Sequence, residues 1–228
     1  MKLILHAYEG LCSEEQMAMD EWMLKAFGYQ QSYHMRLYSM KETYSIGRIQ
    51  KYASLNGVFE QNSSYKIVRR PTGGGLVQHD DDFVISFVIP SGETLYDLKV
   101  IDLYAYLHQL FSEVLESLQI ESYLNPNCGD SKPSVCFESP TKFDILRKGS
   151  TEKIVGSAIK KTKEGLLVQS SFNCGLKKRN FSRLFLDRLI EKFQFFESVE
   201  KSDRFNDQLE SWKALSEHYK SQAWREKL

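Results

Sequence analysis

The stretch of sequence that decides the fold runs from residue 69 to residue 80 and reads RRPTGGGLVQHD. Three consecutive glycines, Gly73, Gly74 and Gly75, follow two arginines and a short apolar run at residues 65–68 that predicts a strand. Ordering a glycine costs more conformational entropy than ordering other residues. A folded chain therefore keeps such a triplet where its backbone adopts positive φ or closely approaches another group.

This glycine triplet is a candidate anion-binding loop. Successive unhindered N–H groups form a concave nest for an anion, and the guanidinium groups of Arg69 and Arg70 lie next to it in sequence. The spacing differs from a P-loop, because no Gly-Lys-Ser/Thr follows, and from the Gly-x-Gly-x-x-Gly dinucleotide turn. The alternative is a flexible hairpin turn with two solvated arginines.

A second cluster lies at residues 153–158, which read KIVGSA. This run predicts a strand that begins with Lys153 and contains Gly156, and a glycine within a strand indicates a bulge or the close approach of a ligand or backbone. A lysine there would meet the same anion as the glycine loop. The alternative is a lysine at a sheet edge that blocks aggregation.

The rest of the chain predicts a mixture of helices and strands. Residues 17–27 predict a helix ending at Gly28, introduced by a capping box from Ser13 to Gln16. Apolar residues at steps of three and four predict a helix over 100–118, and the segments FDILR, KIVGSAI and LLVQSSF predict a meander. The fold class is α+β, with a mainly antiparallel or mixed sheet flanked by helices. One domain, residues 1–228, is expected, with a C-terminal helical segment at about 176–228, in which Phe181, Leu184, Phe185 and Leu189 share one face, and no separate accessory domain.

Composition excludes several classes of protein. The 228 residues carry 30 Lys+Arg against 30 Asp+Glu, a formal net charge of +0, which argues against general nucleic-acid binding. No apolar run spans a bilayer, and no signal peptide opens the chain. The histidines and four cysteines show no metal-ligand spacing. We expect a cytoplasmic protein that binds neither nucleic acid nor membrane.

Taken together, the two clusters resemble the biotin/lipoate A/B protein ligase family, which includes lipoate–protein ligases and octanoyltransferases. Residues 69–80 resemble its signature Arg-Arg-x-Ser/Thr-Gly-Gly-Gly-x-Val-x-His-Asp, and residues 153–158 resemble its Lys-Ile/Val-x-Gly-Ser-Ala motif. The segments MAMDEWML (17–24) and YSIGRIQ (44–50) are similar to its opening helix and following strand.

The resemblance implies the catalytic-domain fold of that family and an enzyme that attaches lipoyl or octanoyl groups to a lysine of a lipoyl carrier domain. Implied partners are the lipoyl domains of 2-oxoacid dehydrogenases, the glycine cleavage H protein and acyl carrier protein. As a ligase, our first interpretation, the enzyme would use ATP and Mg²⁺ to make an acyl-adenylate from lipoate or octanoate. Lys153 would then be catalytic and Asp144 a magnesium ligand. The implied substrate- or adenylate-binding residues are Arg69, Arg70, Thr72, Gly73, Gly74, Gly75, His79, Gly156, Ser157 and Ala158.

The sequence departs from the ligase pattern in ways that leave two alternatives open. Residues 135–140 (VCFESP) resemble the Cys-Phe-x-x-Pro loop of one octanoyltransferase class, in which a cysteine, here Cys136, takes the acyl group as a thioester without ATP. Against this alternative, those enzymes commonly carry Arg where this chain has Gly75. The altered segments at residues 79–82 (His-Asp-Asp-Asp) and 169–171 (Gln-Ser-Ser) leave open a third alternative, a catalytically reduced acyl- or adenylate-binding protein. Phe143 stands where the ligases carry the Asn of their Asn-Asp pair, which argues against magnesium binding at Asp144.

Overall fold

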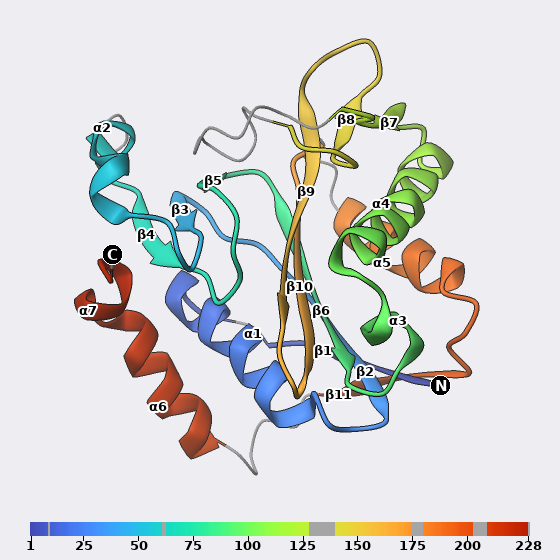
Figure 1. Ribbon diagram of the computed structural model, residues 1–228, viewed down its shortest axis with the longest axis horizontal. Helices are drawn as coiled ribbons and strands as arrows, with labels where there is room; N and C mark the ends of the chain where they lie inside the picture. Colours follow the sequence, from blue (N-terminus) through green and yellow to red (C-terminus); the bar gives the residue numbers. More distant parts are fainter. Residues whose placement is uncertain (9, 61–62, 128–139, 175–179, 203–208, 228) are drawn as a thin grey trace.

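The structure, a computed structural model, describes residues 1–8, 10–60, 63–127, 140–174, 180–202 and 209–227 (Figure 1). A mixed eight-stranded sheet forms its centre, in the order β11-β1-β2-β6-β10-β9-β8-β7. The two neighbours of β1 run parallel to it, and every other pair is antiparallel. The strands are β1 (Lys2–His6), β2 (Ser32–Tyr38), β6 (Phe83–Pro90), β7 (Ser122–Leu124), β8 (Ile145–Arg147), β9 (Lys153–Lys161), β10 (Gly165–Phe172) and β11 (Ser198–Ser202).

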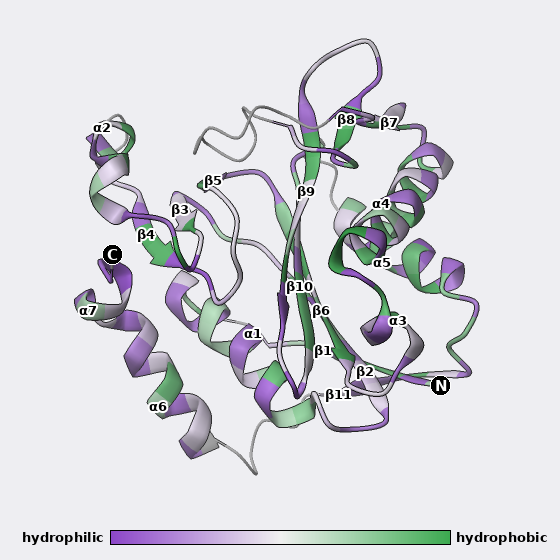
Figure 2. Ribbon diagram, in the orientation of Figure 1, coloured by the Kyte–Doolittle hydropathy of each residue, from purple (hydrophilic) through white to green (hydrophobic). Residues whose placement is uncertain are grey.

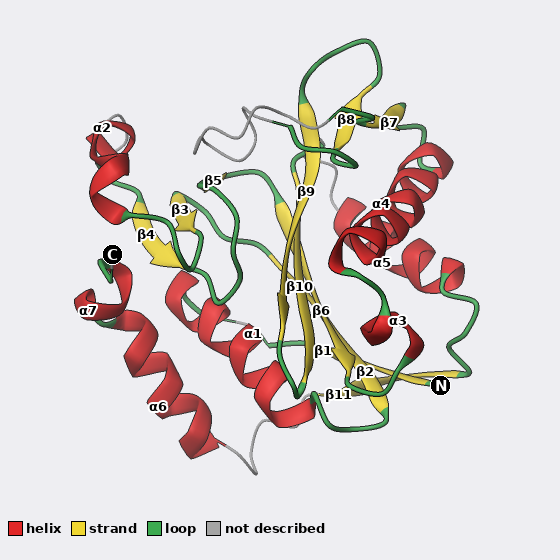
Figure 3. Ribbon diagram, viewed as in Figure 1, coloured by secondary structure: helices red, strands yellow, loops and turns green. Residues whose placement is uncertain are grey.

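The central strand β6 is buried along its whole length because helices cover both faces of the sheet. Its odd-numbered apolar residues join the core beneath α4 (Val100–Ser117) and α5 (Phe181–Lys192). Val84 and Val88 point the other way, toward α1 (Ser13–Phe27) and α6 (Leu209–Lys220). Figure 3 shows these helix pairs on either side of the sheet, and Figure 2 shows the hydrophobic strands between them.

A smaller sheet of three strands sits beside the first and carries the glycine loop. In it, β3 (Thr43–Ile46) pairs parallel with β4 (Lys66–Arg69) and antiparallel with β5 (Val77–His79). The loop of residues 70–76 joins β4 to β5, so it spans the end of β3. The remaining elements are η1 (Tyr52–Leu55), α2 (Asn56–Phe59), α3 (Thr94–Asp97) and α7 (Gln222–Arg225). Within the described residues, no helix is long and apolar enough to cross a bilayer.

The fold class predicted from the sequence is confirmed, and so are the two long helices and the β8-β9-β10 meander. Three details differ. The carboxylate of Glu15 accepts from the backbone N–H of Cys12 while Ser13 contacts Thr43, so the helix begins one residue earlier than the predicted capping box. The C-terminal segment contains strand β11, which pairs with β1, and Leu184 is exposed rather than part of the buried face of α5.

Candidate acyl-binding site

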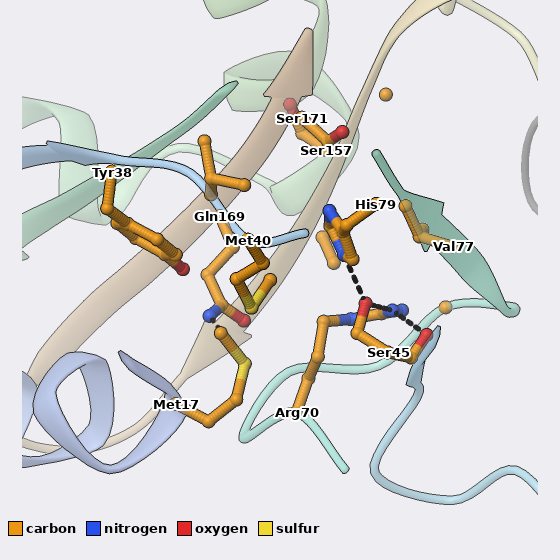
Figure 4. Close-up of a pocket in the computed structure, with 14 residues that line it drawn as sticks. Met17, Tyr38, Met40, Ser45, Arg70, Val77, His79, Ser157, Gln169 and Ser171 are labelled. Atoms are coloured by element: carbon orange, nitrogen blue, oxygen red, sulfur yellow. Dashed lines mark hydrogen bonds between the residues drawn. The ribbon is translucent and has the colours of Figure 1, made fainter. Parts of the chain in front are cut away.

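A pocket opens where the glycine loop of the small sheet meets β9, β10 and the first turns of α1 (Figure 4). Its cavity volume is about 40 Å³. That volume is below the range of about 300–1,000 Å³ that is typical of small-molecule sites. Its lining residues are Met17, Tyr38, Met40, Ser45, Arg70, Gly74, Val77, His79, Val84, Gly156, Ser157, Ala158, Gln169 and Ser171.

Four of the side chains that line the pocket are apolar. Met17 and Met40 lie together on one side of it, and Val77 and Val84 come from strands β5 and β6. All four side chains are nine-tenths or more buried. The two methionine side chains can adapt their shape to an irregular occupant.

The glycine loop forms another wall and closely approaches the loop that follows β3. Gly74 has a φ of 90°, and a Cβ placed on Gly47 would lie 1.9 Å from the Gly74 carbonyl oxygen. The guanidinium of Arg70 donates from Nη2 to the carbonyl oxygens of Gly73 (2.9 Å) and Gly75 (2.7 Å). Arg70 thus fixes the curvature of the loop from inside.

Arg69 and Arg70 have different surroundings although they are adjacent in sequence. Arg69 is fully buried and donates to the carbonyl oxygens of five residues, and it does not line the pocket. These acceptors tie the loop after β3 to the C-terminal helix; they are Gly47, Arg48, Gln50, Trp224 and Arg225. The alternative of a flexible turn with two solvated arginines is wrong, because Arg70 is also buried.

Lys153 is buried at the start of β9, with its ammonium 2.8 Å from Oδ2 of Asp144. Its side chain lies over Gly156, where an added Cβ would meet Lys153 Cε at 2.4 Å and Nζ at 2.7 Å. The glycine therefore leaves the space that the lysine occupies. The alternative of an aggregation-blocking edge lysine is wrong, because β9 lies between β10 and β8.

The Asp144 carboxylate is surrounded by donors. Besides Lys153, Oδ2 accepts from the backbone N–H of Thr141 (2.6 Å) and from its hydroxyl, and Oδ1 accepts from Tyr104. The described residues contain no cluster of three or more His, Cys, Asp or Glu side chains able to hold a metal. A magnesium ion at Asp144 would have to displace these donors, and this ligand assignment stays a prediction.

Ser157 is held in the pocket wall by neighbours on both sides. Its hydroxyl lies 2.7 Å from Nε2 of His108 and 2.7 Å from Oγ of Ser170. Burial lowers the pKa of His108 to about 3, so the ring is neutral at ordinary pH. Ser157 is thus fixed by neutral hydrogen bonds.

On the opposite side of the pocket, His79 lies between two polar side chains. Its Nε2 is 2.6 Å from Ser45 Oγ, and its Nδ1 is 2.7 Å from Asp82 Oδ2. Ser171 of β10 also donates to Asp82, at 2.5 Å. Arg70 donates to Ser45 Oγ at 2.8 Å, which connects the glycine loop to this chain of hydrogen bonds.

Gln169 links the glycine loop to α1. Its Oε1 accepts from the Thr72 hydroxyl and its Nε2 donates to Asp20 Oδ2, both at 2.6 Å. Asp20 is fully buried and ion-paired with Arg36 at 3.0 Å. Gln169, one of the residues that depart from the ligase pattern, therefore has a clear structural role.

Six of the predicted site residues line one pocket: Arg70, Gly74, His79, Gly156, Ser157 and Ala158. Lys153 is not part of the lining, but its side chain lies over Gly156. Thr72 supports the loop, and Arg69 lies outside the lining. Cys136 falls outside the described residues. Sequence reasoning assigned no site role to Ser45, Met17 or Met40. Met17 and Ser45 lie in the segments 17–24 and 44–50 that resemble the family, which was the signal that could have found them, whereas Met40 lies in no motif.

Solved structures with this fold come from lipoate-attaching systems. A T. acidophilum protein with bound lipoic acid superposes with a TM-score of 0.75 over all of both chains at 18% identity. A bi-partite lipoate protein ligase from Thermoplasma acidophilum gives 0.69 at 17% identity, covering 99% of this chain and 96% of that one. At these identities the likeness establishes the fold.

The chain belongs to the family described as the lipoyl protein ligase A/B catalytic domain, whose model matches residues 13–203. The resemblance drawn from the glycine loop and residues 153–158 is therefore confirmed. Among individual relatives, an octanoyltransferase LipM from Staphylococcus epidermidis is 28% identical over 164 residues, which cover 67% of this chain and 55% of the relative. The chain spans about half the length of the curated relatives it matches.

Proposed function

We propose that this protein transfers an octanoyl or lipoyl group from a thioester donor to a lysine of a lipoyl carrier domain, without ATP. Membership of a family of lipoyl- and octanoyl-attaching enzymes supports the reaction class. The relatives named octanoyltransferases, at 25–31% identity, support a thioester donor. This proposal reverses the order of the two enzymatic interpretations drawn from the sequence.

The single observation that carries the proposal is the buried Lys153 ammonium held over Gly156 at the edge of an apolar pocket. A cation there draws electron density from an acyl carbonyl and stabilises the oxyanion that develops during attack. The low exposure of Lys153 strengthens this interaction, because water does not screen it.

The aliphatic part of the substrate would lie against Met17, Met40, Val77 and Val84. Burial of an aliphatic chain contributes about 0.8 kcal/mol per CH₂ group, so a medium-length chain supplies several kcal/mol of binding. This energy comes from a part of the substrate remote from the reacting carbonyl and helps hold that carbonyl beside Lys153.

Cys136 is the proposed acyl acceptor. Its thiolate would attack the donor carbonyl, forming a new thioester as the donor C–S bond breaks and the donor thiolate leaves. The ε-amine of the carrier lysine would then attack this thioester, forming an amide, releasing the Cys136 thiolate and losing a proton. Thr141, five residues after Cys136, donates to the Asp144 carboxylate that also binds Lys153.

A second candidate, the ATP-dependent ligase, is favoured by Gly75, which follows the ligase pattern where the transferases commonly carry Arg. In that scheme Arg70, Gly73 and Gly74 would hold the adenylate phosphate, and ATP would supply the activation of the free acid. The donors around Asp144 argue against its use as a magnesium ligand.

The test combines one acceptor with two donor conditions. Purified protein is incubated with an apo lipoyl domain and either octanoyl-acyl carrier protein, or lipoate with ATP and Mg²⁺, and the acceptor mass is followed. The proposal predicts modification with the first donor alone. Modification only in the second condition would establish the ligase, and neither product would support an acyl- or adenylate-binding protein.

Two cysteine variants distinguish the thioester route from the ATP-dependent route. We expect Cys136→Ser to abolish transfer, and mass spectrometry of the wild-type protein to find octanoate on Cys136. Cys12→Ser is the matched control, since Cys12 is a partly exposed free cysteine at the start of α1, away from the pocket lining, where serine is a favourable capping residue. Full activity of Cys136→Ser would rule out the thioester route.

A further inference from the structure

Two side chains of the pocket lining, Ser45 and His79, form a nucleophile–base–carboxylate arrangement with the buried Asp82, and the proposed transfer reaction does not use it. Ser45 Oγ lies 2.6 Å from His79 Nε2, and His79 Nδ1 lies 2.7 Å from Asp82 Oδ2. The residues come from β3, β5 and the turn before β6, and all three are buried. Such a constellation is recognised by its geometry and roles, whatever the order of its members along the chain.

The hydrogen bonds assign a role to each member. A neutral His79 that donates from Nδ1 to Asp82 has Nε2 available as the acceptor for the Ser45 hydroxyl proton. Ser171 donates to the same Asp82 oxygen at 2.5 Å and helps fix the carboxylate. Arg70 Nη1 is 2.8 Å from Ser45 Oγ, so a positive charge lies next to the oxygen that would become the nucleophile.

The location of Ser45 determines the substrate that reaches it. Ser45 and His79 both line the apolar pocket, and Ser45 has no solvent exposure. An acyl carbonyl therefore meets this hydroxyl only when its aliphatic chain occupies the pocket. Figure 4 shows Ser45, His79 and Arg70 together on one side of that pocket and Met17 with Met40 on another.

We propose that Ser45, with His79 as general base and Asp82 as its orienting partner, is a second acyl acceptor that gives the protein a hydrolytic activity toward medium-chain acyl thioesters and activated esters. The inference rests on the proposed function only for the nature of the pocket's occupant. It uses a different nucleophile and a different final acceptor, which is water.

The reaction balances without a further co-reactant. His79 Nε2 takes the proton from Ser45 Oγ as the O–C bond forms, and the donor C–S bond breaks. The leaving thiolate then takes that proton from His79. In the second half, His79 takes a proton from water as the water attacks the acyl-serine, and the proton returns to Ser45 Oγ. The products are a thiol and a carboxylic acid, which ionises to the carboxylate and releases one proton to solvent.

The first experiment labels the wild-type protein with a fluorophosphonate that bears an octyl chain and maps the adduct by peptide mass spectrometry. We expect the adduct on Ser45. Ser157 and Ser171, which line the same pocket, are internal controls read in the same digest. A matching probe with an ethyl chain should label at least tenfold less. An adduct on another serine, or none, overturns the proposal without depending on the folding of any variant.

The second experiment measures release of octanoate from an octanoyl thioester in the absence of carrier domain. We expect Ser45→Ala and His79→Gln each to lower this rate by about 100-fold or more, the scale of lost nucleophilic or general-base catalysis. Cys12→Ser, at a cysteine that does not line the pocket, should retain the hydrolytic rate. Melting temperatures check that the variants remain folded, and an unaltered rate in folded Ser45→Ala overturns the proposal.

Transfer to the lipoyl domain is recorded in parallel so that the two proposals fail separately. A Ser45 adduct and hydrolysis without any transfer would contradict the proposed function alone. Transfer by the wild-type protein with no Ser45 adduct and no hydrolysis would contradict the second acceptor alone.

Discussion

Lys153 and Asp144 form an ion pair of 2.8 Å in which the lysine side chain is 2% exposed and the aspartate side chain is fully buried. Removal of two charges from water is costly, and attraction between them repays the cost only with good geometry and further hydrogen bonds. Tyr104 and Thr141 supply those bonds to the carboxylate. The pair therefore holds the ammonium at a defined place beside the pocket.

Lys153→Ala should abolish acyl transfer, with a loss of roughly 100-fold or more, because the ammonium that stabilises the developing oxyanion is removed. The variant also leaves the Asp144 carboxylate buried and unpaired, which costs roughly 3–5 kcal/mol of stability. The double variant Lys153→Ala/Asp144→Asn removes the unpaired charge, so it should recover stability in urea denaturation without recovering transfer. Recovery of acyl transfer in the double variant would show that Lys153 does not take part in the reaction.

Gly156→Ala tests the position of the lysine without altering its charge. The new Cβ would lie 2.4 Å from Lys153 Cε, the far end of a flexible side chain, so the ammonium moves while the backbone remains. A displacement of about 1 Å costs roughly 100-fold in rate. We therefore expect Gly156→Ala to lower the rate of acyl transfer by roughly 100-fold and to change the melting temperature little. Gly57→Ala is the control, since a Cβ there meets nothing within 4 Å.

Much of this site was predictable from sequence because its central parts are contiguous. The loop at residues 69–80 and the strand at 153–158 each carry their chemistry in one run, and period-2 and period-3.6 patterns predicted most elements around them. Unlike these runs, the exposed strand β11 has polar residues in most positions, so its pairing with β1 left no hydrophobic pattern to detect.

Other features depend on which distant segments meet. Arg69 and Arg70 are indistinguishable within the sequence motif. In the structure, Arg69 contacts the C-terminal helix, 155 residues away, whereas Arg70 contacts the glycine loop. Ser45 and Asp82 gain meaning only because His79 lies between them in space. Pairings of this kind are set by tertiary packing, which single-sequence periodicity does not encode.

Arg69→Lys should destabilise the protein even though charge is retained. The guanidinium reaches five carbonyl groups with donors in a fixed planar arrangement, and an ammonium with three donors cannot replace it. We expect a loss of about 2–4 kcal/mol in the free energy of unfolding, the scale of one or two charged hydrogen bonds. Urea denaturation measures it, with Arg188→Lys on the exposed face of α5 as control. Equal free energies of unfolding for the two variants would contradict a stabilising role of the Arg69 hydrogen bonds.

Three buried histidines make stability depend on pH. Burial lowers the pKa of His6 to about 4, with the Arg36 charge adding to the effect, and burial lowers the pKa values of His34 and His108 to about 3. His6 Nε2 and His34 Nδ1 lie 2.8 Å apart, a contact that needs one donor and one acceptor and is lost when both rings are protonated. In the unfolded chain the pKa of each is about 6.5.

The free energy of unfolding should therefore fall as the pH drops from 7 to 5. In that window the unfolded chain takes up protons that the native histidines exclude, so stability rises with pH by up to about 1.4 kcal/mol per pH unit for each histidine. Hydrogen bonds from Tyr219 and Lys160 outweigh burial and hold the pKa of Glu21 at about 2, which keeps that carboxylate ionised throughout. Urea denaturation at pH 7, 6 and 5 measures the slope. His6→Asn should reduce this slope by up to about 1.4 kcal/mol per pH unit, the contribution of one proton. His218→Asn, at an exposed position, is the control. An unchanged slope in His6→Asn would contradict the lowered pKa of His6.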